Sequence, residues 1–143
     1  MERKKKKTRI MVFGTFDGLH QGHLFFFRQA KKLAKKSFLI VSIARDRNVL
    51  KIKRKFPTLN ERARMILIKK CGLTDKVVLS GVKNHLPHIT KEHPEIIVLG
   101  YDQKAYVKNL KKDLKNKGIN VKIVRLKPYK INIYKNHLLK IKN

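Results

Sequence analysis

The sequence has few acidic residues, a single cysteine and no long apolar run. Because Cys71 stands alone, we expect neither a disulfide framework nor a cysteine metal site, and a cytoplasmic location is the default expectation. No stretch of about 18 apolar residues occurs, so we expect no membrane-spanning helix. The basic segment Met1–Lys7 does not predict a secretory signal, because Asp17 and His20 interrupt the apolar stretch that follows it.

The scarcity of acidic residues leaves a large positive charge. Only 9 Asp and Glu oppose 37 Lys and Arg, which gives a formal net charge of +28. Such a charge attracts phosphates, either on nucleotides or on nucleic acid. However, 28 of the basic residues are Lys and only 9 are Arg, the residue that suits planar phosphate recognition. We therefore interpret most of the excess as compositional bias, with non-specific polyanion binding as its consequence.

The 143 residues predict one domain, with a basic N-terminal tail at residues 1–8 and the domain itself at 9–143. Short apolar runs alternate along the chain with longer amphipathic segments. This pattern predicts an α/β fold, a single Rossmann-like doubly wound domain with a five-stranded parallel sheet. The expected strands are 10–13, 38–44, 77–79, 96–99 and 121–126, and the expected helices are 23–36, 60–71, 85–91, 103–117 and 133–142.

Ligands bind past the carboxyl ends of the strands in such folds, which draws attention to the loops after Phe13, Ala44 and Leu99. The first loop reads GTFDGLHQGH, residues 14–23. Its glycines allow the backbone to approach a ligand closely. A helix is expected to start at about Gln21, and its free N–H groups suit a phosphate.

His20 and His23 lie three residues apart across this helix start, so both rings can face one point. Gly22 between them removes a side chain that would block access. Two imidazoles aimed at a phosphate can donate hydrogen bonds to charge that develops in a transition state. A capping and packing feature, or a metal site, is the alternative interpretation of the pair.

Residues 14–23 as a whole resemble the nucleotidylyltransferase superfamily, whose hallmark is His-x-Gly-His behind Gly-Thr-Phe-Asp. The resemblance continues over nearly the whole chain, through segments 41–46, 51–55, 60–65 and 96–103. Within the superfamily the chain is most similar to the archaeal-type FAD synthases, through Ala44-Arg45-Asp46 and Leu99-Gly100-Tyr101-Asp102-Gln103. The glycerol-3-phosphate cytidylyltransferases are the next most similar group.

The resemblance implies a reaction in which an acceptor phosphate attacks the α-phosphate of a nucleoside triphosphate and pyrophosphate leaves. ATP and FMN are the favoured substrates. One alternative is CTP-dependent cytidylyl transfer to glycerol 3-phosphate or a similar polyol phosphate. The other is a catalytically weakened protein that binds nucleotides or nucleic acid. The resemblance also implies a homodimer and Mg²⁺ bridging phosphate oxygens, with no protein ligands assigned to the metal.

The resemblance also assigns roles to individual residues. His20 and His23 are the catalytic pair and contact the α- and β-phosphates. Arg62 is the phosphate-binding arginine. Arg64 is interpreted as a surface residue on a neighbouring face of the same helix. The nucleotide- and phosphate-binding set is Gly14, Thr15, Phe16, Asp17, Gly22, Lys53, Arg62, Gly100, Asp102, Lys130, Asn136 and His137.

Two of these assignments have alternatives. Lys51, Lys53 and Lys55 point to one side, towards the phosphates, if residues 51–55 are an extended loop. A solvated basic loop is the other interpretation of that segment. Asp102 either binds the ribose or base of a nucleotide or caps the helix after it.

The chain departs from the superfamily pattern near its C-terminus. Asn136 and His137 stand where two small hydroxyl residues usually open the last helix, and Lys130 stands where relatives often have Arg. A working variant, a shifted substrate and a weakened enzyme all remain open. The other histidines, His85, His88 and His93, are interpreted as surface residues.

Overall fold

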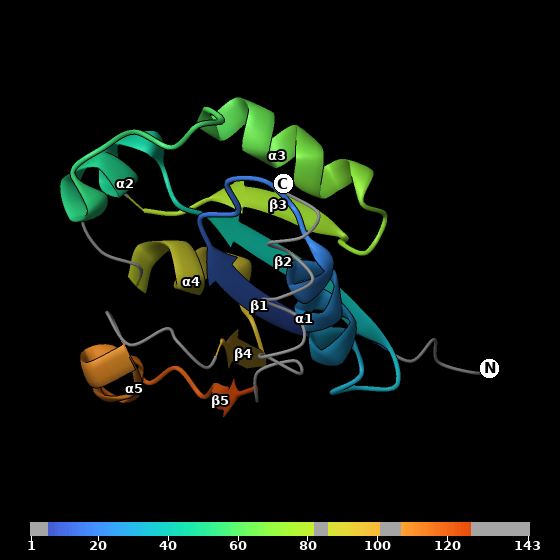
Figure 1. Ribbon diagram of the computed structural model, residues 1–143. Coiled ribbons are helices and arrows are strands. Elements are labelled where there is room, and N and C mark those ends of the chain that lie inside the picture. The colour runs from blue at the N-terminus through green and yellow to red at the C-terminus, as the bar shows by residue number, and fades with distance from the viewer. Residues whose placement is uncertain (1–5, 82–85, 101–106, 127–143) are drawn as a thin grey trace.

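Five parallel strands form one sheet in the computed structural model, which describes residues 6–81, 86–100 and 107–126 (Figure 1). The order across the sheet is β3-β2-β1-β4-β5. Buried residues of β1 and β2 are mostly apolar on both faces, as a sheet covered by helices on each side requires. The predicted five-stranded parallel sheet is confirmed. Its strands are β1 (Thr8–Gly14), β2 (Ser37–Ile43), β3 (Lys76–Leu79), β4 (Ile96–Leu99) and β5 (Lys122–Arg125).

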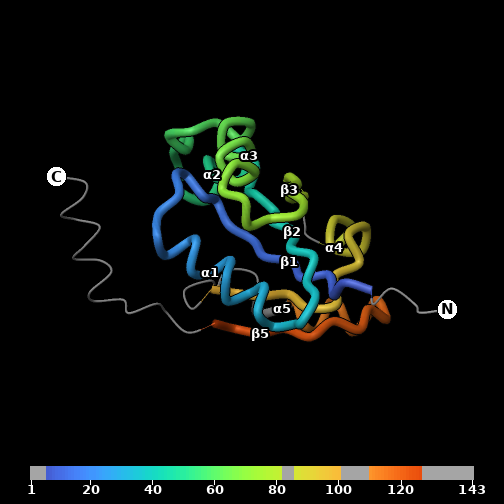
Figure 2. Tube along the Cα trace, turned by 90° about the vertical axis from the view of Figure 1, so that its right-hand side faces the viewer, coloured from blue at the N-terminus to red at the C-terminus, as the bar shows by residue number. Residues whose placement is uncertain are grey.

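Helices cover both faces of this sheet, and each face has its own apolar core. Figure 2 shows α1 and α4 on opposite sides of the strands. Phe27 and Ile68, from α1 and α3, pack on one face with Ile10 and Val12 of β1. The other core joins β1 to the α4 and α5 residues Ile89, Leu110 and Leu114. The helices are α1 (Gln21–Lys31), α2 (Asp46–Lys53), α3 (Glu61–Lys70), α4 (Leu86–Glu92) and α5 (Val107–Asn116).

The strand order reverses between β1 and β4. The chain proceeds from β1 outward to β2 and β3, and then returns to place β4 on the other side of β1. The register pairs Val12 with Val98, so Gly14, the last residue of β1, and Gly100, which follows β4, lie at the same edge of the sheet. Ligands bind at such a switch point in open α/β sheets. The loop after β1 and the end of β4 therefore mark one candidate site.

Helix α1 ends earlier than its sequence pattern predicts. The expected helix ran to Lys36, but the observed helix stops at Lys31. The Lys36 carbonyl accepts a hydrogen bond from the Thr8 N–H at 2.8 Å, and β2 begins at the next residue. Lys36 therefore already takes part in the hydrogen bonds between β1 and β2. The helix must end several residues earlier so that the chain can reach this position.

The expectation of an extended basic loop at residues 51–55 is wrong. Residues 46–53 form helix α2, which Arg54 ends in the left-handed conformation with φ 60°. Tertiary contacts stabilise this helix: Val49 is buried, and the Asp46 N–H donates to the Glu61 carboxylate at 2.9 Å. Since Lys51 and Lys53 are two positions apart on a helix, their side chains point in nearly opposite directions. They cannot form the one-sided row of lysines that the sequence suggested.

The other helices start or end within a few residues of their predicted positions where they are described. Helix α4 covers Leu86–Glu92 against an expected 85–91. Residues 103–106 of the expected 103–117 helix lie outside the described residues, as does the whole expected helix at 133–142. Within the described ranges no helix has both the length and the apolar character needed to cross a bilayer.

A buried carboxylate ties the opposite, amino edge of the sheet together. Glu92 is 3% exposed, and its Oε1 lies 2.8 Å from Lys76 Nζ and 3.4 Å from Arg9 Nη2. Arg9 Nε also donates to the Glu92 carbonyl at 2.7 Å, and its guanidinium lies over the Phe38 ring. A carboxylate this deeply buried is stable only when cations accompany it. This cluster stabilises the fold at a distance from the candidate site.

Candidate active site

The loop after β1 folds back on itself through Phe16. Phe16 has a left-handed backbone with φ 53°, yet its side chain is only 6% exposed. A Cβ added to Gly14 would lie 2.5 Å from the Phe16 ring, closer than real contacts allow. Gly14 is thus required because the aromatic ring occupies the space beside it. The ring contacts His23 edge-on at a centroid distance of 5.2 Å and Phe27 at 5.3 Å.

His20 and His23 meet at the start of α1, as their spacing predicts. Their rings are stacked, with centroids 3.7 Å apart and an interplanar angle of 20°. His20 is the N-cap, and its Nδ1 accepts a hydrogen bond from the Gly22 N–H at 3.1 Å. His23 Nδ1 accepts in turn from the His20 N–H at 3.3 Å. The pair is therefore a capping feature, and capping fixes the direction of both rings.

Capping also determines which nitrogen of each ring carries the proton. Because both Nδ1 atoms accept hydrogen bonds, the neutral ring of each residue carries its proton on Nε2. Burial, together with the nearby His20, lowers the pKa of His23 from 6.5 to about 4. His23 is consequently neutral near pH 7 and is a donor through Nε2. No acidic side chain occupies the first turn of α1, so its N-terminus keeps the positive potential that attracts an anion.

Asp17 ties the loop to the segment before α3. Its two carboxylate oxygens accept the backbone N–H groups of Thr58 and Leu59, each at 2.7 Å. Desolvation raises the pKa of Asp17, but these hydrogen bonds and the charge of Arg64 outweigh it and leave the pKa below its ordinary value. Asp17 is therefore ionised near neutral pH. The nucleotide-binding role that the resemblance implies for Asp17 stays a prediction.

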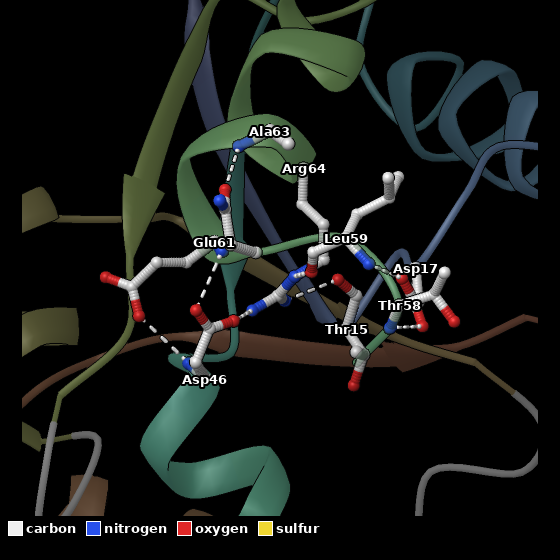
Figure 3. Close-up of polar contacts among 9 residues, drawn as sticks. Thr15, Asp17, Asp46, Thr58, Leu59, Glu61, Ala63 and Arg64 are labelled. Atoms are coloured by element: carbon white, nitrogen blue, oxygen red, sulfur yellow. Dashed lines mark hydrogen bonds and ion pairs between the residues drawn. The ribbon is translucent and has the colours of Figure 1, made fainter. Parts of the chain in front are cut away.

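The interpretation of Arg64 as a surface residue is wrong. Its side chain is completely buried and lies among three segments of the chain (Figure 3). Arg64 Nη1 donates to the Thr15 carbonyl at 2.8 Å, Nε donates to the Leu59 carbonyl at 3.1 Å, and Nη2 pairs with Asp46 Oδ1 at 2.6 Å. Helical spacing explains the burial, because Arg64 lies one turn before Ile68 on the face of α3 that meets the core.

The starts of α2 and α3 cap one another. The Asp46 N–H donates to Glu61 Oε1 at 2.9 Å, and the Glu61 N–H donates to Asp46 Oδ2 at 3.1 Å (Figure 3). Asn60 completes the α3 cap by accepting the Ala63 N–H at 2.8 Å. Each carboxylate therefore satisfies an N–H group that its partner helix leaves open. The two helix starts form one rigid unit beside the loop after β1.

The other predicted binding residues lie either on described elements or outside the described ranges. Gly22 lies in the first turn of α1, and the carbonyl of Gly100, directly after β4, accepts from Arg125 Nη1 at 2.7 Å. The side chains of Arg62 and Lys53 are exposed on α3 and α2. Their roles, and those of the residues outside the described ranges, stay predictions. Outside the described ranges lie Asp102, Lys130, Asn136 and His137.

Of the three histidines interpreted as surface residues, His88 is not fully exposed. It is half-buried on α4, and its Nε2 lies 2.7 Å from the hydroxyl oxygen of Ser42, a buried residue of β2. His93 is exposed, and His85 lies outside the described residues.

The described residues do not form a metal site. No group of three His, Cys, Asp or Glu side chains in these ranges lies close enough to hold an ion. Both oxygens of Asp17, the carboxylate in the loop, already accept backbone N–H groups.

Sequence reasoning missed the residues that hold the loop in place. Arg64, Asp46 and Glu61 join segments that lie between 15 and 49 positions apart, and no local motif marks such contacts. A signal existed for Arg64 alone, since its spacing from Ile68 places it on the buried face of α3.

A protein family and two FAD synthases match most of this chain in sequence. The family described as Cytidylyltransferase-like matches residues 11–138. An FAD synthase from Aciduliprofundum boonei is 40% identical over 122 residues, which cover 85% of this chain and 80% of the relative. An FAD synthase from Korarchaeum cryptofilum is 43% identical over 119 residues, covering 82% of this chain and 80% of the relative.

A solved structure has the same fold over nearly its whole length. It is the crystal structure of a lipopolysaccharide core biosynthesis protein from Thermoplasma volcanium, with a TM-score of 0.78 and 35% identity. The alignment covers 87% of this chain and 99% of that chain.

Proposed function

The chain belongs to the cytidylyltransferase-like family and is a nucleotidyltransferase, and from this premise we propose that it is an FMN adenylyltransferase, an FAD synthase. A phosphate oxygen of FMN attacks the α-phosphorus of ATP. The bond from that phosphorus to the oxygen of the β-phosphate breaks, and pyrophosphate leaves. The products are FAD and pyrophosphate. The protein makes no covalent bond in this step, so its work is positioning and charge stabilisation.

The stacked histidine pair is the observation that carries nucleotidyl transfer. Both rings are fixed through Nδ1, and in this proposal Nε2 of each ring donates to a phosphate at the N-terminus of α1. Negative charge increases on the α- and β-phosphate oxygens as pyrophosphate departs. Preorganised donors at that point stabilise the transition state more than the ground state. The capping contacts supply the preorganisation, so the capping and catalytic interpretations of the pair are compatible.

The low pKa of His23 suits this role. A neutral ring keeps its Nδ1 free of a proton and able to accept from His20 N–H. A protonated ring would lose that hydrogen bond and with it the fixed direction of Nε2. His23 therefore acts as a neutral hydrogen-bond donor near pH 7 rather than as a fixed positive charge.

The proposed reaction includes Mg²⁺, which the resemblance implies. Bound together with the nucleotide, it would neutralise phosphate charge. Arg62 on α3 and Lys53 on α2 are exposed, and in this proposal they add positive charge for the triphosphate. Asp102, Lys130, Asn136 and His137 keep the nucleotide-binding roles that the resemblance implies.

A set of paired substrates tests the proposed function. ATP with FMN and Mg²⁺ should give FAD and pyrophosphate in equal amounts. Riboflavin, which has the same ring system but no phosphate, should give neither product and is the matched control. CTP with glycerol 3-phosphate tests the cytidylyltransferase alternative. Product from the CTP pair, with none from ATP and FMN, would overturn the choice of FMN while preserving the reaction type.

A further inference from the structure

Arg64 is a buried cation that the proposed reaction does not use. Its side chain has 0% exposure, so it cannot reach a substrate phosphate. Its hydrogen bonds go to Thr15, Leu59 and Asp46, from three segments of the chain. Burying a guanidinium is costly unless its donors are satisfied. A role is needed that explains why this cation lies directly behind the loop that holds the histidine pair.

We propose that Arg64 is a positioning residue that holds the Thr15–Phe16 peptide and, through the Phe16 ring, the orientation of His23. This inference rests on the proposed function. The path is a series of direct contacts. Asp46 pairs with the guanidinium, the guanidinium binds the Thr15 carbonyl, and the Phe16 ring packs edge-on against the His23 ring.

The backbone at Phe16 explains why such a hold is needed. A non-glycine residue with φ 53° has a strained backbone conformation, which persists only where the surrounding structure imposes it. The hydrogen bond from Arg64 fixes the carbonyl immediately before Phe16. Because the peptide is planar and trans, the same bond directs the Phe16 N–H away from the guanidinium. Arg64 thus constrains the peptide whose rotation would release the ring.

The geometry of the guanidinium is suited to this task, and an ammonium is not. Arg64 reaches three acceptors on three segments with three different nitrogens of one planar group. A lysine has a single nitrogen and cannot span those positions together. Asp46 is itself fixed by the Glu61 N–H, so the charge partner of Arg64 does not move freely. The hold therefore depends on the shape of the side chain as well as on its charge.

Arg64→Lys tests the proposal, with Arg9→Lys as the matched control. Both replace an arginine that serves a carboxylate, but Arg9 lies at the amino edge of the sheet, on Glu92. We expect Arg64→Lys to lower kcat by about 10- to 100-fold with little change in KM for ATP, because misplaced catalytic groups slow the chemical step. Arg9→Lys should lower the melting temperature and leave kcat unchanged. Equal effects of the two variants on kcat would overturn the proposal.

A second readout does not depend on turnover. The pKa of His23, measured by NMR titration without substrate, should rise from about 4 towards 6.5 in Arg64→Lys, because a released ring becomes hydrated. It should stay low in Arg9→Lys. An unchanged His23 pKa in Arg64→Lys contradicts the proposal. If the parent makes no FAD, the proposed function fails while this titration still tests the positioning of His23.

Asp46→Asn provides a second test of the proposal in case Arg64→Lys does not fold. The amide oxygen can still accept from Arg64, but the ion pair is lost. We expect a smaller fall in kcat and a smaller rise in the His23 pKa, since the guanidinium is held less firmly. A parent-like kcat and His23 pKa in Asp46→Asn, with Arg64→Lys unfolded, would also overturn the proposal.

Discussion

At the scale of single residues, two imidazoles stabilise the start of α1, and the proposed function gives them a catalytic role as well. The Nδ1 atoms of His20 and His23 accept backbone N–H groups there, and the proposal uses Nε2 of each ring as a donor to phosphate. The same contacts cap the helix and select the tautomer. Under the proposed function, a substitution at either histidine removes a phosphate donor and a cap together, so activity and stability must be measured separately.

Replacement of His20 or His23 by Ala should reduce kcat for pyrophosphate release by about 10²–10³, the usual effect of removing one donor to transition-state charge. Loss of the cap should also cost about 1 kcal/mol of stability. His93→Asn is the control, because His93 is exposed and outside the loop, and Asn tolerates its φ of 51°. Parent-like rates in both Ala variants would contradict the catalytic role.

The low pKa of His23 makes stability dependent on pH. Folded His23 takes up a proton only at about pH 4, whereas the unfolded residue does so at about 6.5. Between these values the unfolded chain binds more protons, so the free energy of unfolding falls as the pH is lowered from 6.5 towards 4. This contribution is fully present above pH 6.5.

Urea unfolding at pH 7 and pH 5 measures the effect. The parent should lose about 1–2 kcal/mol more than His23→Gln between the two values. Gln at this position can still cap the helix but does not titrate. An identical loss in both proteins would show that His23 has an ordinary pKa in the folded state.

At the scale of elements, a glycine and an aromatic ring make the turn between β1 and α1. Gly14→Ala would place a Cβ 2.5 Å from the Phe16 ring, so the ring or the strand end must move. We expect a loss of about 1–3 kcal/mol in the free energy of unfolding and a lower kcat, since Phe16 contacts His23.

Gly118→Ala is the matched control for this turn. Gly118 also needs its conformational freedom, with φ 70°, but an added Cβ there has open space. It should lose about 1 kcal/mol from backbone strain and keep the parent kcat. If Gly14→Ala lost no more activity than Gly118→Ala, the packing of Phe16 would not position the catalytic pair.

The sequence predicted the elements that carry their own signal. Strand β4 was predicted residue for residue, because a buried parallel strand is an uninterrupted apolar run. Helix α2 was missed because its support is tertiary, from the burial of Val49 and the carboxylate of Glu61. In the site, the ten residues 14–23 are contiguous and could be recognised together. The contacts of Arg64 and Asp46 could not be predicted, because their partners are remote in sequence, although the spacing of Arg64 from Ile68 indicated its burial.

At the scale of the whole molecule, the net charge of +28 has no single structural cause. Arg64 and Arg9 are committed to internal carboxylates, and Lys76 serves Glu92. Most other lysines in the described residues are exposed to solvent. A charge of this kind speeds the approach of anions without selecting among them.

Binding to nucleic acid should therefore be weak and non-specific. The affinity for duplexes of unrelated sequence should be equal and should fall steeply between 50 and 200 mM salt, because counterion release is its source. Fluorescence anisotropy with two labelled duplexes measures this. Sequence-dependent binding that persists at high salt would instead favour the alternative of a nucleic-acid-binding protein on an enzyme fold.

The most direct test of nucleotidyl transfer follows the phosphorus atoms of ATP in a single turnover with FMN. ATP labelled at the α-phosphate should transfer its label to FAD, and ATP labelled at the γ-phosphate should transfer its label to pyrophosphate, in equal amounts. His23→Ala should slow both by the same factor. Label from the α-phosphate that never enters FAD, while the nucleotide is bound and the protein is folded, would contradict the account.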